Sequence, residues 1–266
     1  MKGKLFLLIA FFVVQMPAFC QSDSIRLNDW KMVKMDNAGY MYMVMTNGDL
    51  TRRTPGSDTT SMIYSPVRKT RISLLDVSNP LRTFLFYEDL QEYVILDRFL
   101  TETGRYRLNS LTPYAGMVAP AINNQLWLVD MVDFSIKKVD PQRDEVVIRI
   151  PLPQILDPDD SDFTYMREYQ NLLFLVDLNS GIYLFDNLGN VMRRIDRAAV
   201  AYLNFDQNTM YYQLENDPET LYLENFYTGK EEKRALPAAA RTVLLKSGRM
   251  WLFSDKVAIK YNIAEE

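Results

Sequence analysis

Residues 171–195, NLLFLVDLNSGIYLFDNLGNVMRRI, decide the fold because apolar runs and turn residues alternate along them. Residues 172–178 form an apolar run, Asn179-Ser180-Gly181 is a turn signal, residues 182–185 form a second apolar run, and a second turn surrounds Gly189. This pattern predicts three β-strands joined by tight turns. A helix is disfavoured because the two glycines would interrupt it and the first run lacks a 3.6-residue period.

The same unit recurs along the chain at nearly regular intervals. Aligning the second strand of each copy superposes Tyr42, Leu85, Trp127, Phe174, Tyr211 and Trp251. Successive positions are separated by 43, 42, 47, 37 and 40 residues. A period near forty with four short strands per copy is typical of a β-propeller. We therefore predict an all-β, six-bladed β-propeller, and a two-sheet sandwich is the alternative.

The last copy lacks a fourth strand. Its predicted strands are residues 241–246, 249–253 and 257–261, whereas an unassigned strand at 24–30 precedes the first blade. We expect this N-terminal strand to complete the last blade, since closing the ring removes an exposed sheet edge. In blade two we expect strands at 92–99 and 105–109. Residues 21–266 are predicted to form one propeller domain.

The clearest copy also resembles a known repeat family. Residues 173–177, LFLVD, are followed by 181–186, GIYLFD, and then by Gly189-Asn190. An apolar strand that ends in Asp, and a second strand that leads to an Asp-x-x-Gly turn, resemble the NHL and related six-bladed propeller repeats. Other copies match in part, for example Leu128-Val129-Asp130. The resemblance implies a fold and no particular function, because such propellers serve as binding platforms and occasionally as enzymes.

The N-terminus carries the features of a secretory signal peptide. Lys2 and Lys4 form a positive segment, residues 5–14 are apolar, and residues 17–20 resemble a cleavage region. We predict a signal peptide at 1–20 with cleavage before Gln21, which removes the only cysteine. The alternative is an outer-membrane lipoprotein modified at Cys20, although the preceding Phe19 departs from the small residue usual there. The expected location is periplasmic or secreted.

Composition restricts the partners. Without residues 1–20 the chain has 28 basic and 34 acidic residues, a net charge of −6. An acidic chain without a basic cluster does not predict nucleic-acid binding, which requires a concentrated positive surface. No second apolar stretch approaches the ~20 residues needed to span a membrane.

The residue inventory also restricts the chemistry. The chain contains no histidine, which removes Ser-His-Asp and Cys-His catalysis and the usual zinc, copper and iron sites. Carboxylate chemistry such as glycoside cleavage stays formally open. We predict no catalytic residue and no cofactor.

Several loops are predicted to share one face of the ring, because connections between blades and turns between second and third strands lie on the same side of a propeller. These loops are the basic stretch 64–70 and the acidic stretches 88–91, 151–161 and 215–218. The candidate binding residues are Tyr64, Arg68, Lys69, Glu88, Asp89, Asp159, Asp160, Glu215 and Asp217. They would form a polar recognition face around the channel, and ordinary solvated loops are the alternative. Alternating oxygen donors at 157–162 also leave a calcium loop open, although the glycine and distal glutamate of an EF-hand are missing.

Together these features predict a protein-interaction module of a bacterial envelope, with an envelope or outer-membrane protein as its partner. The alternative is a propeller that binds or cleaves a carbohydrate.

Overall fold

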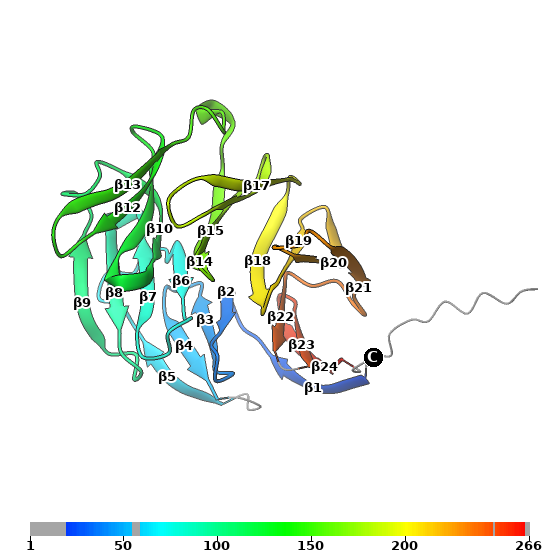
Figure 1. The fold of residues 1–266 in the computed structure, drawn as a ribbon. Helices are drawn as coiled ribbons and strands as arrows, with labels where there is room; N and C mark the ends of the chain where they lie inside the picture. Colours follow the sequence, from blue (N-terminus) through cyan, green and yellow to red (C-terminus); the bar gives the residue numbers. More distant parts are fainter. Residues whose placement is uncertain (1–19, 55–58, 247, 264–266) are drawn as a thin grey trace, which may run out of the picture.

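The computed structural model describes residues 20–54, 59–246 and 248–263. Within these ranges the chain forms six four-stranded antiparallel sheets arranged around a common centre (Figure 1). This arrangement confirms the predicted all-β, six-bladed propeller. The predicted signal peptide lies, apart from Cys20, outside the described residues.

The strands of the blades follow from the centre of the ring outward. Blade one contains β2 (Trp30–Met35), β3 (Met41–Met45), β4 (Leu50–Arg53) and β5 (Thr60–Tyr64). Blade two contains β6 (Leu74–Asp76), β7 (Thr83–Tyr87), β8 (Glu92–Leu96) and β9 (Glu102–Arg107). Blade three contains β10 (Ala115–Pro120), β11 (Leu126–Asp130), β12 (Ser135–Asp140) and β13 (Glu145–Pro151).

The second half of the ring repeats this order. Blade four contains β14 (Phe163–Tyr169), β15 (Leu172–Asp177), β16 (Gly181–Phe185) and β17 (Val191–Asp196). Blade five contains β18 (Val200–Asp206), β19 (Thr209–Leu214), β20 (Asp217–Asn225) and β21 (Glu231–Ala235). Blade six contains β22 (Thr242–Lys246), β23 (Arg249–Phe253), β24 (Val257–Asn262) and β1 (Cys20–Arg26). Three short 3₁₀ helices lie between strands: η1 (Glu88–Leu90), η2 (Ile122–Asn124) and η3 (Pro158–Asp160).

The N-terminal strand closes the ring, as predicted. β1 pairs antiparallel with β24, with Ile25 opposite Ala258, so the blue and red ends of the chain lie side by side in Figure 1. The strand is earlier in the chain than the expected 24–30. The pairing continues by one hydrogen bond beyond the strand, from the Leu27 N–H to the Lys256 carbonyl at 2.8 Å, and the chain then turns at Asp29, which has a positive φ of 41°. Trp30 then begins β2.

The blades pack face against face, which explains why their middle strands are apolar on both sides. All six aligned positions of the repeat are buried: Tyr42, Leu85, Trp127, Phe174, Tyr211 and Trp251. Burial of large apolar and aromatic side chains is the main stabilising contribution available to such a sheet. The repeated position therefore serves packing between blades.

The turns between third and fourth strands reuse one hydrogen-bond pattern. The Asp186 carboxylate accepts the N–H groups of Leu188 and Asn190 at 2.9 and 2.8 Å, with Gly189 at a φ of 92°. The Asp97 carboxylate accepts the N–H groups two and four residues later in the same way, at 2.8 and 2.9 Å. β8 therefore ends at Leu96, and the expected strand at 92–99 was too long. β9 correspondingly begins earlier than the expected 105.

The ring has two distinct faces. The first carries the connections between blades and the turns between second and third strands, and we call it the loop face. The second carries the turns between first and second strands and between third and fourth strands, and we call it the reverse face. The topology confirms that the four predicted loops all belong to the loop face.

Candidate functional site

Three predicted residues lie on one continuous polar surface over blades one to three. Lys69 forms an ion pair with a carboxylate in the turn between β3 and β4. Thr70 Oγ1 donates to Asp89 Oδ2 at 3.1 Å, which links the connection after blade one to η1 in blade two. The Tyr114 hydroxyl donates to Glu88 Oε1 at 3.0 Å, which links η1 to the connection before blade three. The structure therefore brings Lys69, Glu88 and Asp89 together.

Arg68 and Tyr64 also contribute to a charged cluster inside this surface. Arg68 donates to both carboxylate oxygens of Glu92, at 3.0 and 2.7 Å. Arg105 and Arg107 reach the same carboxylate at 3.2 and 3.3 Å, and Arg105 also donates to the Tyr64 hydroxyl at 3.2 Å. Burial alone would raise the pKa of Glu92, but the hydrogen bonds from the three guanidinium groups lower it. Arg68 therefore helps to neutralise a buried carboxylate.

Exposed apolar side chains lie beside these polar residues. Tyr114, Met131 and Val132 are 41%, 36% and 66% exposed. The N–H of Met131 donates to the Tyr114 carbonyl at 3.0 Å, so these residues are neighbours. A Cβ at Gly116 would come within 2.8 Å of the Met131 side chain, so this glycine lets Met131 lie against the sheet. We call Tyr114, Met131 and Val132 the loop-face patch.

The remaining predicted residues lie elsewhere on the loop face. Asp159 and Asp160 belong to η3, where the Asp160 carbonyl accepts from Asn179 at 2.8 Å. Glu215 lies in the turn between β19 and β20, but Asp217 is already the first residue of β20 and accepts a hydrogen bond from Tyr222. The expected four-residue loop at 215–218 was therefore too long. Among the described residues, no hydrogen bond or ion pair joins these four to blades one and two.

The acidic stretch at 157–162 serves as a local cap. The Asp157 side chain accepts the N–H of Asp159 at 3.0 Å and so begins η3. The N–H of Asp162 donates to the Asp177 carboxylate at the end of β15. Within the described parts of the chain, no three acidic side chains converge in an arrangement that could hold a metal ion. The described residues therefore give no support to the calcium loop that the sequence left open at 157–162.

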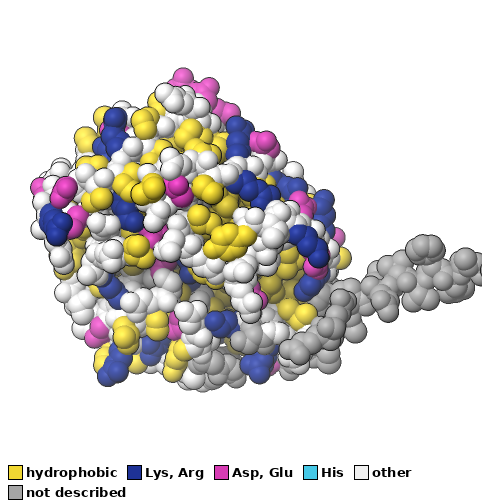
Figure 2. All heavy atoms as spheres, viewed as in Figure 1, with side chains coloured by type: hydrophobic (Ala, Val, Ile, Leu, Met, Phe, Trp, Pro, Cys, Tyr) yellow, Lys and Arg dark blue, Asp and Glu magenta, His cyan; other side chains and the backbone are white. Residues whose placement is uncertain are grey.

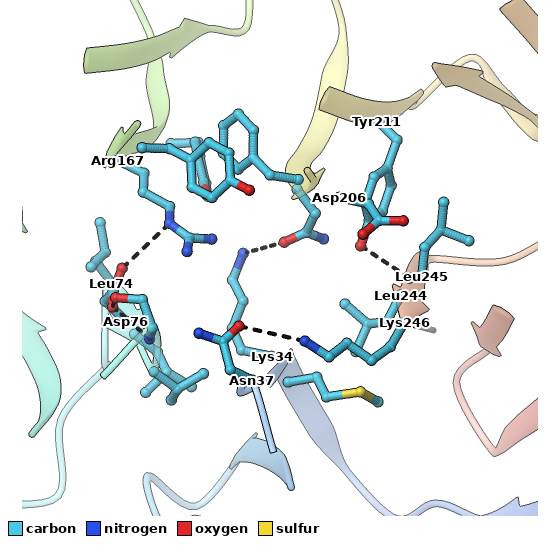
Figure 3. Close-up of a pocket in the computed structure, with 18 of the residues that line it drawn as sticks. Lys34, Asn37, Leu74, Asp76, Arg167, Asp206, Tyr211, Leu244, Leu245 and Lys246 are labelled. Carbon is cyan, nitrogen blue, oxygen red and sulfur yellow. Dashed lines mark hydrogen bonds and ion pairs between the residues drawn. The ribbon is translucent and has the colours of Figure 1, made fainter. Parts of the chain in front are cut away.

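The structure reveals a further site that the sequence did not predict. A cavity of about 270 Å³ lies in the central channel, among the innermost strands β2, β6, β14, β18 and β22 (Figure 3). Residues of the turns that follow these strands also line it, including Asn37, Ser78 and Gln207. It therefore opens toward the reverse face. A smaller cavity of about 180 Å³ lies toward the loop face, and Lys34, Tyr165 and Asn204 line both.

Lys34 occupies the centre of the channel. Its Nζ donates to Asn204 Oδ1 at 3.3 Å and lies 4.8 Å from the centroid of the Tyr165 ring. The pKa of Lys34 is lowered to about 8, mainly by burial and also by the positive charge of Arg167, while the negative charge of Asp76 opposes these effects. Lys34 and Arg167 thus face the same cavity, as Figure 3 shows.

The other charged groups of this cavity lie around Lys34. Arg167 Nε lies 3.8 Å from Asp76 Oδ2, and Lys246 Nζ donates to Asn37 Oδ1 at 3.4 Å. Asp206 lines the cavity from an exposed position at the end of β18. The cavity is therefore lined by three cationic and two anionic side chains.

A sequence signal for the channel did exist. In all six blades, the residue paired with the aligned position of the repeat lies in the innermost strand: Lys34 with Tyr42, Leu75 with Leu85, Ala119 with Trp127, Arg167 with Phe174, Asn204 with Tyr211, and Leu244 with Trp251. Three of these six positions carry a polar side chain, and polar residues are uncommon at the centre of a packed ring. Aligning first strands as well as second strands would have singled them out.

The fold and its two faces define a six-bladed β-propeller. No protein-family model matches this chain, and no curated protein matches it in sequence. Among solved structures, the fold is similar to the propeller domain of Cps50 (Swd1) from Myceliophteria thermophila, with a TM-score of 0.66 and 9% identity over 93% of this chain and 100% of that one. It is also similar to a streptogramin B lyase (TM-score 0.61, 14% identity, 92% and 87% covered) and to BamB from Moraxella catarrhalis (TM-score 0.56, 9% identity, 92% and 100% covered). Likeness at these identities shows the fold alone.

Two further observations concern the surface. On the side seen in Figure 2, Lys and Arg side chains are interspersed with Asp and Glu and do not gather into one basic area. Within the described residues, no helix has the length and apolar character required to cross a bilayer.

Proposed function

We propose that this propeller is a protein-binding module of the bacterial cell envelope and that its partner contacts the loop face over blades one to three. The observation that carries the proposal is the loop-face patch, which exposes Tyr114, Met131 and Val132 beside the polar residues Glu88 and Asp89. Aromatic residues and methionine surrounded by polar groups are the composition typical of protein interfaces. A partner that buries this patch gains apolar contact, while hydrogen bonds with Glu88 and Asp89 would fix the orientation of the partner.

The patch is held in place before any partner arrives. The hydrogen bond from Met131 to Tyr114, the bond from Tyr114 to Glu88, and the close approach of Met131 to Gly116 fix its geometry. A preorganised surface loses little side-chain entropy on binding. This rigidity favours recognition of a folded partner surface.

The local carboxylates support a binding role. Glu88 and Asp89 each accept a hydrogen bond from a neighbouring side chain, which fixes them as part of the polar surface around the loop-face patch.

The test places a photo-crosslinking amino acid at position 132 in the full chain expressed in its native envelope. The matched control places it at Leu188, which is 71% exposed in a turn of the reverse face. We expect a discrete protein adduct from position 132 and none from position 188. Equal crosslinking from both positions, or adducts to glycan alone, would contradict the proposal.

Arg68 and Lys69 stay proposed contributors to the same surface. Lys69→Ala removes an exposed ion pair, which contributes about 0–1 kcal/mol to stability, so it should leave the melting temperature nearly unchanged and weaken partner recovery at low salt. Arg68→Ala also takes one of three cations from buried Glu92. We therefore expect a measurable loss of stability from Arg68→Ala and none from Lys69→Ala. A stability loss from Lys69→Ala would make that residue structural.

A further inference from the structure

The cavity in the central channel opens away from the loop face, and the positive charge of Lys34 inside it has no acidic partner at ion-pair distance among the described residues. Among those residues, Lys34 Nζ bonds only the Asn204 amide oxygen, a neutral group. Asp76, which also lines the cavity, is already engaged, because it accepts the N–H of Ser78 at 2.9 Å and pairs with Arg167. The Lys34 charge is therefore not neutralised by the chain itself.

Hydrogen-bond donors around Lys34 are also left without partners. Asn204 is 6% exposed, and its Nδ2 has no acceptor. Arg167 Nε makes no hydrogen bond, since the Asp76 carboxylate lies beyond hydrogen-bond distance at 3.8 Å. Buried donors without acceptors are rare in folded proteins because leaving them unpaired is costly. Asn204, Arg167 and Lys34 all line the same cavity, and Figure 3 shows how Lys34 and Arg167 lie in it.

From this arrangement we propose that the channel cavity binds a small oxyanion, a phosphate or carboxylate group, between Lys34 and Arg167, with Asn204 as an additional donor. An oxyanion would supply acceptors for Arg167 Nε and Asn204 Nδ2, which have none, and a negatively charged partner for the Lys34 amine, so it would place negative charge between two like charges. Charge-assisted hydrogen bonds of this kind are among the strongest available to a protein.

Size and access restrict the ligand to a small molecule. The cavity of about 270 Å³ lies near the lower end of the range for ligand pockets. Entry is from the reverse face, past Lys246 and Asp206 at the ends of β22 and β18. Lys246 adds a third positive charge at the entrance, whereas Asp206 would repel a highly charged polyanion. A single phosphate or a short dicarboxylate fits these conditions.

The lowered pKa of Lys34 gives the site a measurable signature. An anion bound beside the amine favours its protonated form and raises the pKa again. Binding at about pH 8.5 should therefore be accompanied by proton uptake.

The experiment measures binding of inorganic phosphate, and in a second arm succinate, to the full chain by calorimetry at constant ionic strength. Two buffers of different ionisation enthalpy report the proton uptake. Lys34→Met removes the charge at similar volume, and Lys34→Gln keeps a polar group beside Asn204 in case the first variant folds poorly. The matched control is Lys31→Met, because Lys31 is exposed and borders the smaller cavity toward the loop face.

We expect saturable binding of at least one probe, weakened about tenfold or more by either Lys34 variant and unchanged by Lys31→Met. Tighter binding of phosphate or of succinate identifies the ligand class. The inference is overturned if neither probe binds, if a folded Lys34 variant binds as tightly as the parent, or if Lys31→Met causes an equal loss. None of these results depends on a partner at the loop face.

Discussion

Closure of the ring by β1 leads to a quantitative prediction for Ile25→Ala. Ile25 lies in the middle of β1 opposite Ala258, and only 4% of its surface is exposed. It belongs to a cluster of buried residues with Trp30 and Phe253, whose ring centroids are 6.0 Å apart. The side chain therefore fixes the closing strand to the interface between the last and first blades.

The cost follows from the cavity that the shorter side chain leaves. Replacing a buried isoleucine by alanine typically costs about 2–5 kcal/mol, and the whole domain is expected to be stable by about 5–15 kcal/mol. At this chain length each kcal/mol lowers the melting temperature by about 2–4 °C. Ile25→Ala should therefore lower the melting temperature by about 4–20 °C and shift the urea midpoint to lower concentration.

The control uses the neighbouring residue on the same strand. Ser24 is exposed, so Ser24→Ala should change stability by no more than about 0.5 kcal/mol. Both variants are measured by urea denaturation and thermal melting of the same chain. If Ile25→Ala unfolds like Ser24→Ala, the strand is not part of the cooperative unit, and the explanation of closure given above is wrong.

Three further predictions concern processing, titration and a turn. Intact mass should show a mature protein that begins at Gln21 and carries no lipid; a diacylated or triacylated Cys20 would instead place it on a membrane surface. The pKa of Lys34 is lowered from 10.5 to about 8, mainly by burial. The unfolded chain therefore binds more protons between these two pH values, and stability should rise with pH there. Urea titrations from about pH 8 to about pH 9.5 should show this rise in the parent and not in Lys34→Met; parallel curves would argue against a buried cation. Gly181→Ala should destabilise the protein by well over about 1 kcal/mol. Gly181 has a φ of 126°, and an added Cβ would clash with the carbonyl oxygen of Ile195 in β17. Unchanged thermal melting of this variant would show that the turn relaxes to accept the side chain.

The sequence by itself determined the blade pattern and the location of most strands. Residues 172–185 show why: each apolar run and its turn are local, so spacing and turn chemistry suffice to define a hairpin. The missing fourth strand of the last blade also pointed to its completion from the N-terminus, because an open edge is unfavourable. Predictions failed at strand ends such as Leu96, where one carboxylate and two N–H groups decide the boundary.

Only the tertiary structure decided which residues meet in space. Lys34, Arg167 and Lys246 lie in three different blades, far apart in the chain, and they share a cavity because the innermost strands converge on one axis. The loop-face patch likewise depends on contacts between blades, such as Tyr114 with Glu88. Local spacing specifies each hairpin, whereas the angle between neighbouring blades, set by packing of their buried faces, determines which side chains border the channel and which are exposed.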